Sequence, residues 1–352
     1  MNKKSSMGLG MTGSWVLLLF LVAASGVAQD DAESKKTVFI DAQAFTNPTP
    51  TKMPTLRFPQ SELNQGIEGW VGVQMMVDPE GKPYEFEVVS TTGTKAFEVE
   101  ALKAAAAMRF APATLGGHPV DAAVELPVYF ITHTGNGASA EFGKGYQALG
   151  KAIDAKDQIA AEAILKKLTP RNIYESAFFG VAQFKYAARW GSEREQIVGL
   201  RRAISGTTKP QYLDKRFFTL ALQQLFILEV RAQDYAAALA TYETWSAQRP
   251  DSETLAKLQL IAEQVRALRS DGRSYSVQGQ MRTGVWSYRI FKSKFSFTVT
   301  SGRISQIKLY CQNKYVLFRF DPTLQYTIEK GFGECSIVVY GDANTEFQLV
   351  QS

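Results

Sequence analysis

Residues 70–90 read WVGVQMMVDPEGKPYEFEVVS, and this stretch decides the fold of the region around it. Apolar residues occupy every second position from Val71 to Val77, which places them on one face of an extended strand. The sequence Asp78-Pro79-Glu80-Gly81 has proline and glycine at the positions that a β-turn favours. Alternation then resumes over residues 84–90. The stretch therefore predicts a β-hairpin.

A helix and a third strand follow the hairpin. Within residues 95–108, Phe97, Ala101 and Ala105 recur at the spacing of one helix face. Residues 123–132 alternate again as a strand. The order strand, strand, helix, strand predicts a small antiparallel sheet with one helix packed on one face.

Five short motifs fall in a fixed order within residues 57–130. The first three are Arg57-Phe58-Pro59, Gly66-Ile67-Glu68-Gly69-Trp70-Val71 and Val77-Asp78-Pro79-Glu80-Gly81. The fourth is AAAMRFAPA at 105–113, and the fifth is Val128-Tyr129-Phe130. In this order and at these intervals, the motifs resemble those of the TonB C-terminal domain family. The resemblance places such a domain at residues 50–133.

Most of these motif residues are expected to be structural. Gly66 and Gly69 supply unusual φ values or a close backbone approach before the first strand. Trp70 and Phe110 are expected in the core, and Arg109 either extends to solvent or caps the helix C-terminus. The whole structural set is Phe58, Pro59, Gly66, Gly69, Trp70, Gly81, Arg109, Phe110 and Pro112.

The resemblance implies a binding function for the last strand, Val124–Ile131. In the family this strand accepts an extended peptide by β-strand addition, usually the TonB box of an outer-membrane receptor. Pro127 is tolerated on an edge strand, but it removes one possible bond to a partner. The alternative is a strand closed by a neighbouring domain or a second copy. The expected partner contacts are Val124, Leu126, Val128, Tyr129, Phe130 and Ile131.

The N-terminus carries a targeting pattern. Lys3 and Lys4 precede the apolar core Trp15–Ala24, and Gly26-Val27-Ala28 suits cleavage. Residues 1–28 therefore predict a signal peptide that directs the chain to the periplasm. The alternative is an uncleaved inner-membrane anchor, because residues 7–28 lack charge and about 20 apolar residues span a bilayer.

The sequence departs from the family's energy transducers. These carry a spanning helix with a polar residue for an inner-membrane motor, followed by a long spacer rich in Pro, Lys and Glu. Here Trp15–Ala24 contains no His or charge, and the proline-bearing segment after the predicted linker 29–49 is short. A periplasmic adaptor is the leading interpretation. An anchored transducer that works with inner-membrane motor proteins is the alternative.

Two further regions complete the predicted α+β multidomain fold. Residues 141–270 read as helical, and 233–250 resembles the second helix of a tetratricopeptide repeat through Ala238, Tyr242 and Pro250. An unremarkable helical domain is the other interpretation. Residues 274–352 predict a small all-β domain.

The two cysteines lie in that β domain. Cys311 and Cys335 share the inward phase of their strands. In an exported protein this placement predicts a disulfide, with a pair of buried free thiols as the alternative.

The remaining residues do not predict catalysis or a cofactor. The histidines, His118 and His133, have neither metal-ligand spacing nor a neighbouring cysteine, and no phosphate-binding or nucleophile motif occurs. The net charge of +5 includes no basic block, so nucleic acid is not an expected partner. We expect a binding protein, neither an enzyme nor a metalloprotein. An enzyme sited in the aromatic-rich β domain is the third hypothesis, which a cleft lined by two carboxylates would favour.

Overall fold

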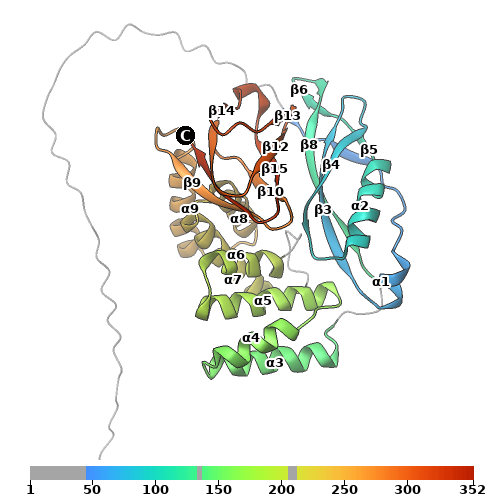
Figure 1. The fold of residues 1–352 in the computed structure, drawn as a ribbon, viewed down its shortest axis with the longest axis vertical. Coiled ribbons are helices and arrows are strands. Elements are labelled where there is room, and N and C mark those ends of the chain that lie inside the picture. Colours follow the sequence, from blue (N-terminus) through green and yellow to red (C-terminus); the bar gives the residue numbers. More distant parts are fainter. Residues whose placement is uncertain (1–44, 133–136, 205–211) are drawn as a thin grey trace, which may run out of the picture. The chain divides into compact units, whose positions relative to one another are not determined.

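A first sheet of three strands carries the residues of the predicted hairpin, in a computed structural model that describes residues 45–132, 137–204 and 212–352. The strands are β3 (Gly69–Val77), β4 (Pro83–Thr91) and β8 (Ala122–Phe130), arranged antiparallel in the order β4-β3-β8 (Figure 1). The turn between β3 and β4 is fixed by Asp78, whose Oδ1 accepts hydrogen bonds from the backbone of Glu80 and Lys82. The described chain is thus a mixed α+β protein.

Helix α2 (Lys95–Ala107) covers one face of this sheet. Its buried residues Phe97, Ala101 and Ala105 pack on the side chains of Val71, Val73, Met75 and Val77, all of which have no exposed surface. The short helix α1 (Gln60–Asn64) precedes β3. The alternating side chains of β3 and the buried face of α2, which recurs about every 3.6 residues, therefore pack into one core.

Short strands occupy two places where the sequence predicted none. Part of the predicted linker forms β1 (Phe45–Thr46) and the start of β2 (Thr49–Lys52), which corrects the linker boundary. They pair with segments between α2 and β8, because the extended backbone that proline imposes also fits a strand. The partner segments are β5 (Arg109–Ala111), β6 (Ala113–Leu115) and β7 (His118–Val120).

Seven helices follow in the described part of the chain, and consecutive helices pack on one another (Figure 1). Most begin at a side chain that caps a backbone N–H; in α6, Ser192 and Glu195 form a reciprocal capping box. The helices are α3 (Ala140–Asp154), α4 (Gln158–Lys167), α5 (Ile173–Trp190), α6 (Glu193–Ala203), α7 (Lys215–Arg231), α8 (Tyr235–Ser246) and α9 (Ser252–Ala267).

The C-terminal region is built from two four-stranded sheets, in the orders β10-β15-β12-β13 and β14-β11-β16-β9. Side chains from both sheets share one buried cluster, and a disulfide joins Cys311 on β12 to Cys335 directly opposite on β15. The strands are β9 (Tyr275–Met281), β10 (Val285–Arg289), β11 (Lys294–Ser301), β12 (Ile304–Cys311), β13 (Tyr315–Arg319), β14 (Tyr326–Thr327), β15 (Cys335–Gly341) and β16 (Thr345–Gln351).

The face of the first sheet opposite α2 is also covered. Met76 of β3 is fully buried in a cluster with Tyr310 and Val338 of the C-terminal region. Tyr315 donates a hydrogen bond of 2.9 Å to Glu85, and Tyr340 donates one to Glu87. The C-terminal region therefore covers this face around Met76.

Glu68 ties the first sheet to the helices. Its carboxylate accepts hydrogen bonds from the backbone N–H and the hydroxyl of Thr132, both at 2.7 Å, and from the backbone N–H of Ile173 at 3.4 Å. Its own N–H donates to the carbonyl of Arg171 at 2.7 Å. Residues 43–352 form one compact unit, so the division into three domains stays a prediction.

Several predictions concern residues outside the described ranges. These are the signal peptide at 1–28, the linker up to residue 44, and His133. Among the described helices, none has the length and apolar character needed to cross a membrane.

Candidate partner-binding site

Strand β8 is an edge strand, because among the described strands it pairs with β3 alone (Figure 1). Its middle is open to solvent, where Glu125 and Pro127 are both exposed. The sequence predicted this edge from the family resemblance. The predicted last residue of the strand, Ile131, lies just beyond β8 and is 40% exposed.

The register fixes which backbone groups of β8 face outward. The carbonyl of Trp70 accepts a hydrogen bond from the N–H of Thr92, so the backbone of Trp70 faces β4. Trp70 and its partner Tyr129 on β8 are therefore a non-hydrogen-bonded pair. Alternation along β8 then turns the backbone groups of Glu125, Pro127 and Tyr129 toward the free edge. Pro127 lacks an N–H, so its outward position leaves the β3 ladder complete.

The side chains of the predicted partner contacts divide between two faces. Val124, Leu126, Val128 and Phe130 point toward α2 and join the core cluster, with Val128 and Phe130 only 7% and 0% exposed. Their side chains therefore do not line the open edge, which corrects that part of the prediction. The reason is that the apolar face of a strand in a two-layer domain packs on the helix. Tyr129 lies on the opposite face and is half-buried.

Most of the motif residues have structural positions. Gly66 and Gly81 adopt φ values of +62° and +78°, and a Cβ on Gly69 would lie 2.9 Å from the backbone of Gly93. The ring of Phe58 packs edge-on against Phe97, at 5.4 Å between centroids.

The later motif residues form the short strand that follows α2. Phe110 is 5% exposed, and its N–H donates to the carbonyl of Gly81 at 2.9 Å. Arg109 donates to the carbonyl of Met108, directly after the helix, at 2.5 Å. Pro59 is half-buried and precedes α1, and Pro112 lies between β5 and β6.

Trp70 does not join the core that α2 covers. It lies on the other face of β3 and lines a small cavity with Ile173, Leu213 and Phe218 of the helical region. Its indole Nε1 is buried, and no hydrogen-bond partner for it occurs among the described groups. Trp70 was expected in the core, but it is half-buried and lies beside residues of a different part of the chain.

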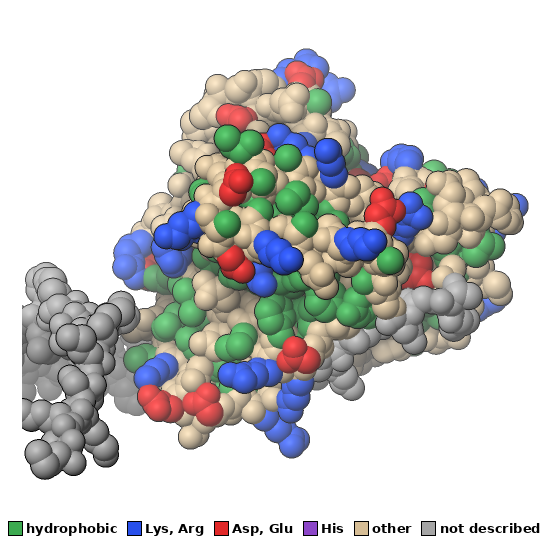
Figure 2. All heavy atoms as spheres, turned by 90° about the horizontal axis from the view of Figure 1, so that it is seen from below, with side chains coloured by type: hydrophobic (Ala, Val, Ile, Leu, Met, Phe, Trp, Pro, Cys, Tyr) green, Lys and Arg blue, Asp and Glu red, His purple; other side chains and the backbone are tan. Residues whose placement is uncertain are grey.

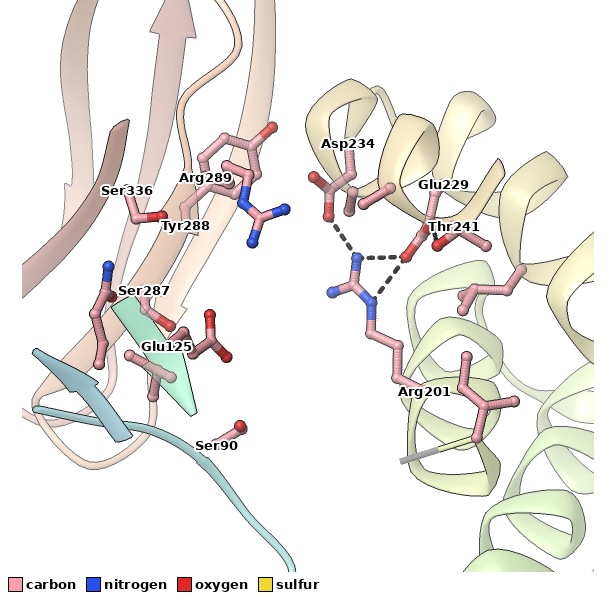
Figure 3. A pocket seen from close by; sticks show the side chains of 16 residues that line it. Ser90, Glu125, Arg201, Glu229, Asp234, Thr241, Ser287, Tyr288, Arg289 and Ser336 are labelled. Carbon is pink, nitrogen blue, oxygen red and sulfur yellow. Dashed lines mark hydrogen bonds and ion pairs between the residues drawn. The ribbon is translucent and has the colours of Figure 1, made fainter. Parts of the chain in front are cut away.

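A polar cavity of about 450 Å³ opens beside β8 (Figure 3). Three parts of the chain line it. The first sheet contributes Gln74, Ser90 and Glu125, helices α6 to α8 contribute an ion-pair network, and β10 contributes Ser287, Tyr288 and Arg289. No sequence motif predicted this cavity, because its walls come from segments far apart in the chain.

The helical wall of the cavity is held by a buried carboxylate. Glu229 of α7 is 1% exposed and accepts hydrogen bonds from Arg201 of α6, at 2.9 Å from Nε and 2.7 Å from Nη2. Thr241 of α8 donates to its other oxygen at 2.7 Å, and Asp234 accepts from Arg201 at 2.6 Å. Burial raises the pKa of Glu229, while the charge of Arg201 opposes the rise. The network joins α6, α7 and α8.

A second cavity of about 230 Å³ adjoins the first and shares four lining residues with it, Gln74, Glu125, Arg289 and Ser336. Glu125 and Arg289 are both exposed. Within the described part of the chain, neither side chain forms an ion pair or a hydrogen bond. In Figure 3 they lie on the same side of the cavity, facing the Arg201 network.

Other features bear on the classes of ligand. Within residues 45–132, 137–204 and 212–352, no group of three or more His, Cys, Asp or Glu side chains is arranged to hold a metal ion. His118 is exposed on β7. On the face shown in Figure 2, Lys and Arg side chains are interspersed with acidic and hydrophobic ones.

Comparison with known proteins identifies the first region. Residues 54–132 match the family described as Gram-negative bacterial TonB protein C-terminal. Protein TonB of Vibrio cholerae serotype O1 is 32% identical over 74 residues, which are 21% of this chain and 30% of that protein. This chain therefore spans under a third of the length of that relative.

One solved structure was also found to be similar to this chain. The solution NMR structure of the Pseudomonas aeruginosa TonB C-terminal domain is 22% identical, covers 26% of this chain and 91% of that one, and has a TM-score of 0.23. The family match and the Vibrio relative carry the assignment. Residues 54–132 of this chain belong to the TonB C-terminal family.

Proposed function

We propose that this chain is an exported TonB-like binding protein whose β8 edge takes up an extended segment of an envelope or outer-membrane transport protein. The observation that carries the proposal is the open β8 edge within a domain of the TonB C-terminal family. Main-chain hydrogen bonds to the edge would provide affinity, and alternate side chains would provide specificity.

The coverage of the sheet supports this choice of surface. Helix α2 covers one face, and the helical and C-terminal regions cover parts of the other around Trp70 and Met76. The sheet has two edge strands, β4 and β8. The middle of β8 is exposed at Glu125 and Pro127, whereas β4 has no exposed residue before Thr91, so β8 is the better place for an extended segment. The outward N–H group of Glu125 is the donor offered there, and Pro127, two residues further along, has no N–H to offer.

The other regions have supporting roles in this proposal. The helical hairpins, with the tetratricopeptide-like α8, form a surface for a second partner. The disulfide-linked β region holds the first sheet from its outer face. Three carboxylates, Glu125, Glu229 and Asp234, line the cavity beside β8, but Arg201 binds the last two, so no free carboxylate pair is available for catalysis. The chain in this proposal therefore acts by binding.

The alternative is an inner-membrane transducer. Identification of the N-terminal residue of the protein recovered from the envelope distinguishes the two: a start near Gln29 favours the adaptor, and an intact Met1 favours the anchored transducer.

The test uses backbone changes at the edge. Peptides that cover the periplasm-facing segments of the outer-membrane transport proteins of the same cell are arrayed and probed with the purified chain. Glu125→Pro removes an outward donor without touching the β3 ladder, and Glu125→Ala is the matched control that keeps the donor. One lost hydrogen bond corresponds to about two- to tenfold weaker binding for Glu125→Pro than for Glu125→Ala.

A change of opposite sign completes the test. Pro127→Ala restores a donor in the middle of the edge, so binding should become tighter. Equal affinity of all these variants for every bound peptide, with unchanged circular dichroism, would show that partners bind elsewhere.

A further inference from the structure

The two polar cavities lie where an added strand would place its side chains. Glu125 lines both cavities and belongs to the face of β8 opposite α2. In an antiparallel or parallel added strand, the neighbour of Glu125 projects to the same face, with Cβ atoms about 5 Å apart. On this face the side chain of the neighbour would lie next to the cavities that Glu125 lines.

The charged side chains that line this cavity sum to a net negative charge, which favours a cation. Glu229 has both oxygens occupied by Arg201 and Thr241, and Asp234 is paired with Arg201 at 2.6 Å. Three carboxylates thus face two guanidinium groups, and the carboxylate of Glu125 has no partner among the described residues. The unpaired carboxylate of Glu125 therefore lies directly beside the position of the incoming strand.

Hydroxyl groups add further acceptors to the same space. Ser90, Ser287 and Ser336 line the cavities, and each of their hydroxyl oxygens can accept a hydrogen bond. A lysine ammonium or arginine guanidinium carries several donors and no acceptor, so this lining suits it.

We propose that the segment bound at β8 carries a lysine or arginine beside Glu125, and that the cavity receives this basic side chain. The proposal rests on the proposed function, since it requires strand addition at this edge. Glu125 is then the residue that determines specificity. Arg289 opposes the incoming cation, because it is exposed, lines both cavities and is the cavity's second positive charge.

The two free charges therefore have effects of opposite sign. Glu125→Gln removes the attraction and should reduce the preference for a basic residue. Arg289→Gln removes a repulsion and should increase it. Both side chains are exposed and form no ion pair within the described part of the chain, so neither change threatens the fold. Glu80→Gln, in the exposed β3–β4 turn, is the control for a loss of charge far from the cavity.

The experiment is a phage-display selection of random nine-residue segments, matched to the nine residues of β8, on the immobilised chain. The readout is the ratio of Lys and Arg to Asp and Glu at each position, relative to the unselected library. One position should be enriched about 1.5- to 5-fold in basic residues, the range of a cross-strand charge pair. The ratio should fall toward one on Glu125→Gln, rise on Arg289→Gln and stay unchanged on Glu80→Gln.

Each other outcome overturns the proposal in a distinguishable way. Enrichment of Asp and Glu that is lost with Arg289→Gln would show that the cavity selects an acid. Selected segments without charge preference, or with a basic preference that survives in Glu125→Gln, would refute the role of Glu125 while leaving strand addition intact. Recovery of no segment on the unaltered chain would remove both this proposal and the proposed function.

Discussion

Replacement of Arg201 by methionine should destabilise the helical wall of the cavity. Arg201 neutralises Glu229, which is 1% exposed and cannot turn to solvent. Two unit charges about 4 Å apart interact by about 4 kcal/mol at an effective dielectric constant of about 20. The Arg201 side chain is itself 45% exposed, so solvent screening reduces this figure. We expect the variant to lose about 2–3 kcal/mol of unfolding free energy at pH 7.

The loss should depend on pH with a defined sign. Burial raises the pKa of Glu229, and Arg201 opposes the rise, so removal of Arg201 raises it further. A carboxyl group whose pKa is higher in the folded state stabilises the fold less as pH rises between its unfolded and folded pKa values. The difference between Arg201→Met and the unaltered chain should therefore be largest at pH 7 and smaller at about pH 5, where the carboxyl takes up a proton more readily.

Urea unfolding followed by circular dichroism measures these free energies. Arg231→Met is the matched control, because Arg231 pairs with Glu193 on the surface of the same helices and should cost less than about 1 kcal/mol. The double change Arg201→Met with Glu229→Gln should recover most of the loss, since no buried charge remains unpaired. Equal stability of Arg201→Met and Arg231→Met, or no recovery in the double variant, would refute the reasoning.

Three further predictions concern the framework around the site. Glu68→Ala should lower the unfolding free energy by about 2–3 kcal/mol, because Thr132 and Ile173 lose a buried carboxylate acceptor; thermal unfolding measures it, and a loss below about 0.5 kcal/mol would contradict the role of Glu68. Reduction of the Cys311–Cys335 disulfide should cost about 3 kcal/mol in urea unfolding, and identical curves with and without reductant would show that the bond contributes nothing. Gly81→Ala should destabilise more than Gly66→Ala, although both have positive φ, because a Cβ at Gly81 would lie 2.0 Å from the carbonyl oxygen of Phe110 while the space around Gly66 is open; equal melting temperatures would contradict this.

The strands, turn and helix of the first sheet could be predicted from sequence because each is specified by a pattern within a few neighbouring residues. Alternation from Val71 to Val77, the Asp78–Gly81 turn and the spacing of Phe97 and Ala101 each specify a neighbour within a few residues. The common inward phase of the two cysteines likewise pointed to the pairing that joins β12 and β15.

Other features had no local signal. Strands β5 to β7 have three residues each, too few for a periodic pattern. The side chains of Val128 and Phe130 were expected at the partner surface, yet an apolar alternation is equally the signature of a core face. Trp70 lines a cavity together with Ile173, which lies about a hundred residues away in sequence.

The cavity beside β8 could not be predicted for the same reason. Glu125, Arg201, Glu229 and Arg289 are separated by dozens of residues, and each alone reads as an ordinary surface or helix charge. Only the packing of three segments brings them together. The sequence therefore predicted an edge strand at β8, whereas the cavity beside that strand is visible only in the structure.

The most direct measurement is amide hydrogen exchange along β8, with and without the tightest-binding envelope peptide. The amide of Glu125 faces the free edge, whereas those of Val124 and Leu126 already bond to β3. With peptide at about 100 times its Kd, exchange at Glu125 should slow by up to about 100-fold, with little change at Val124 and Leu126. Slowed exchange confined to the helices or to the C-terminal sheets, with Glu125 unaffected, would contradict strand addition at this edge.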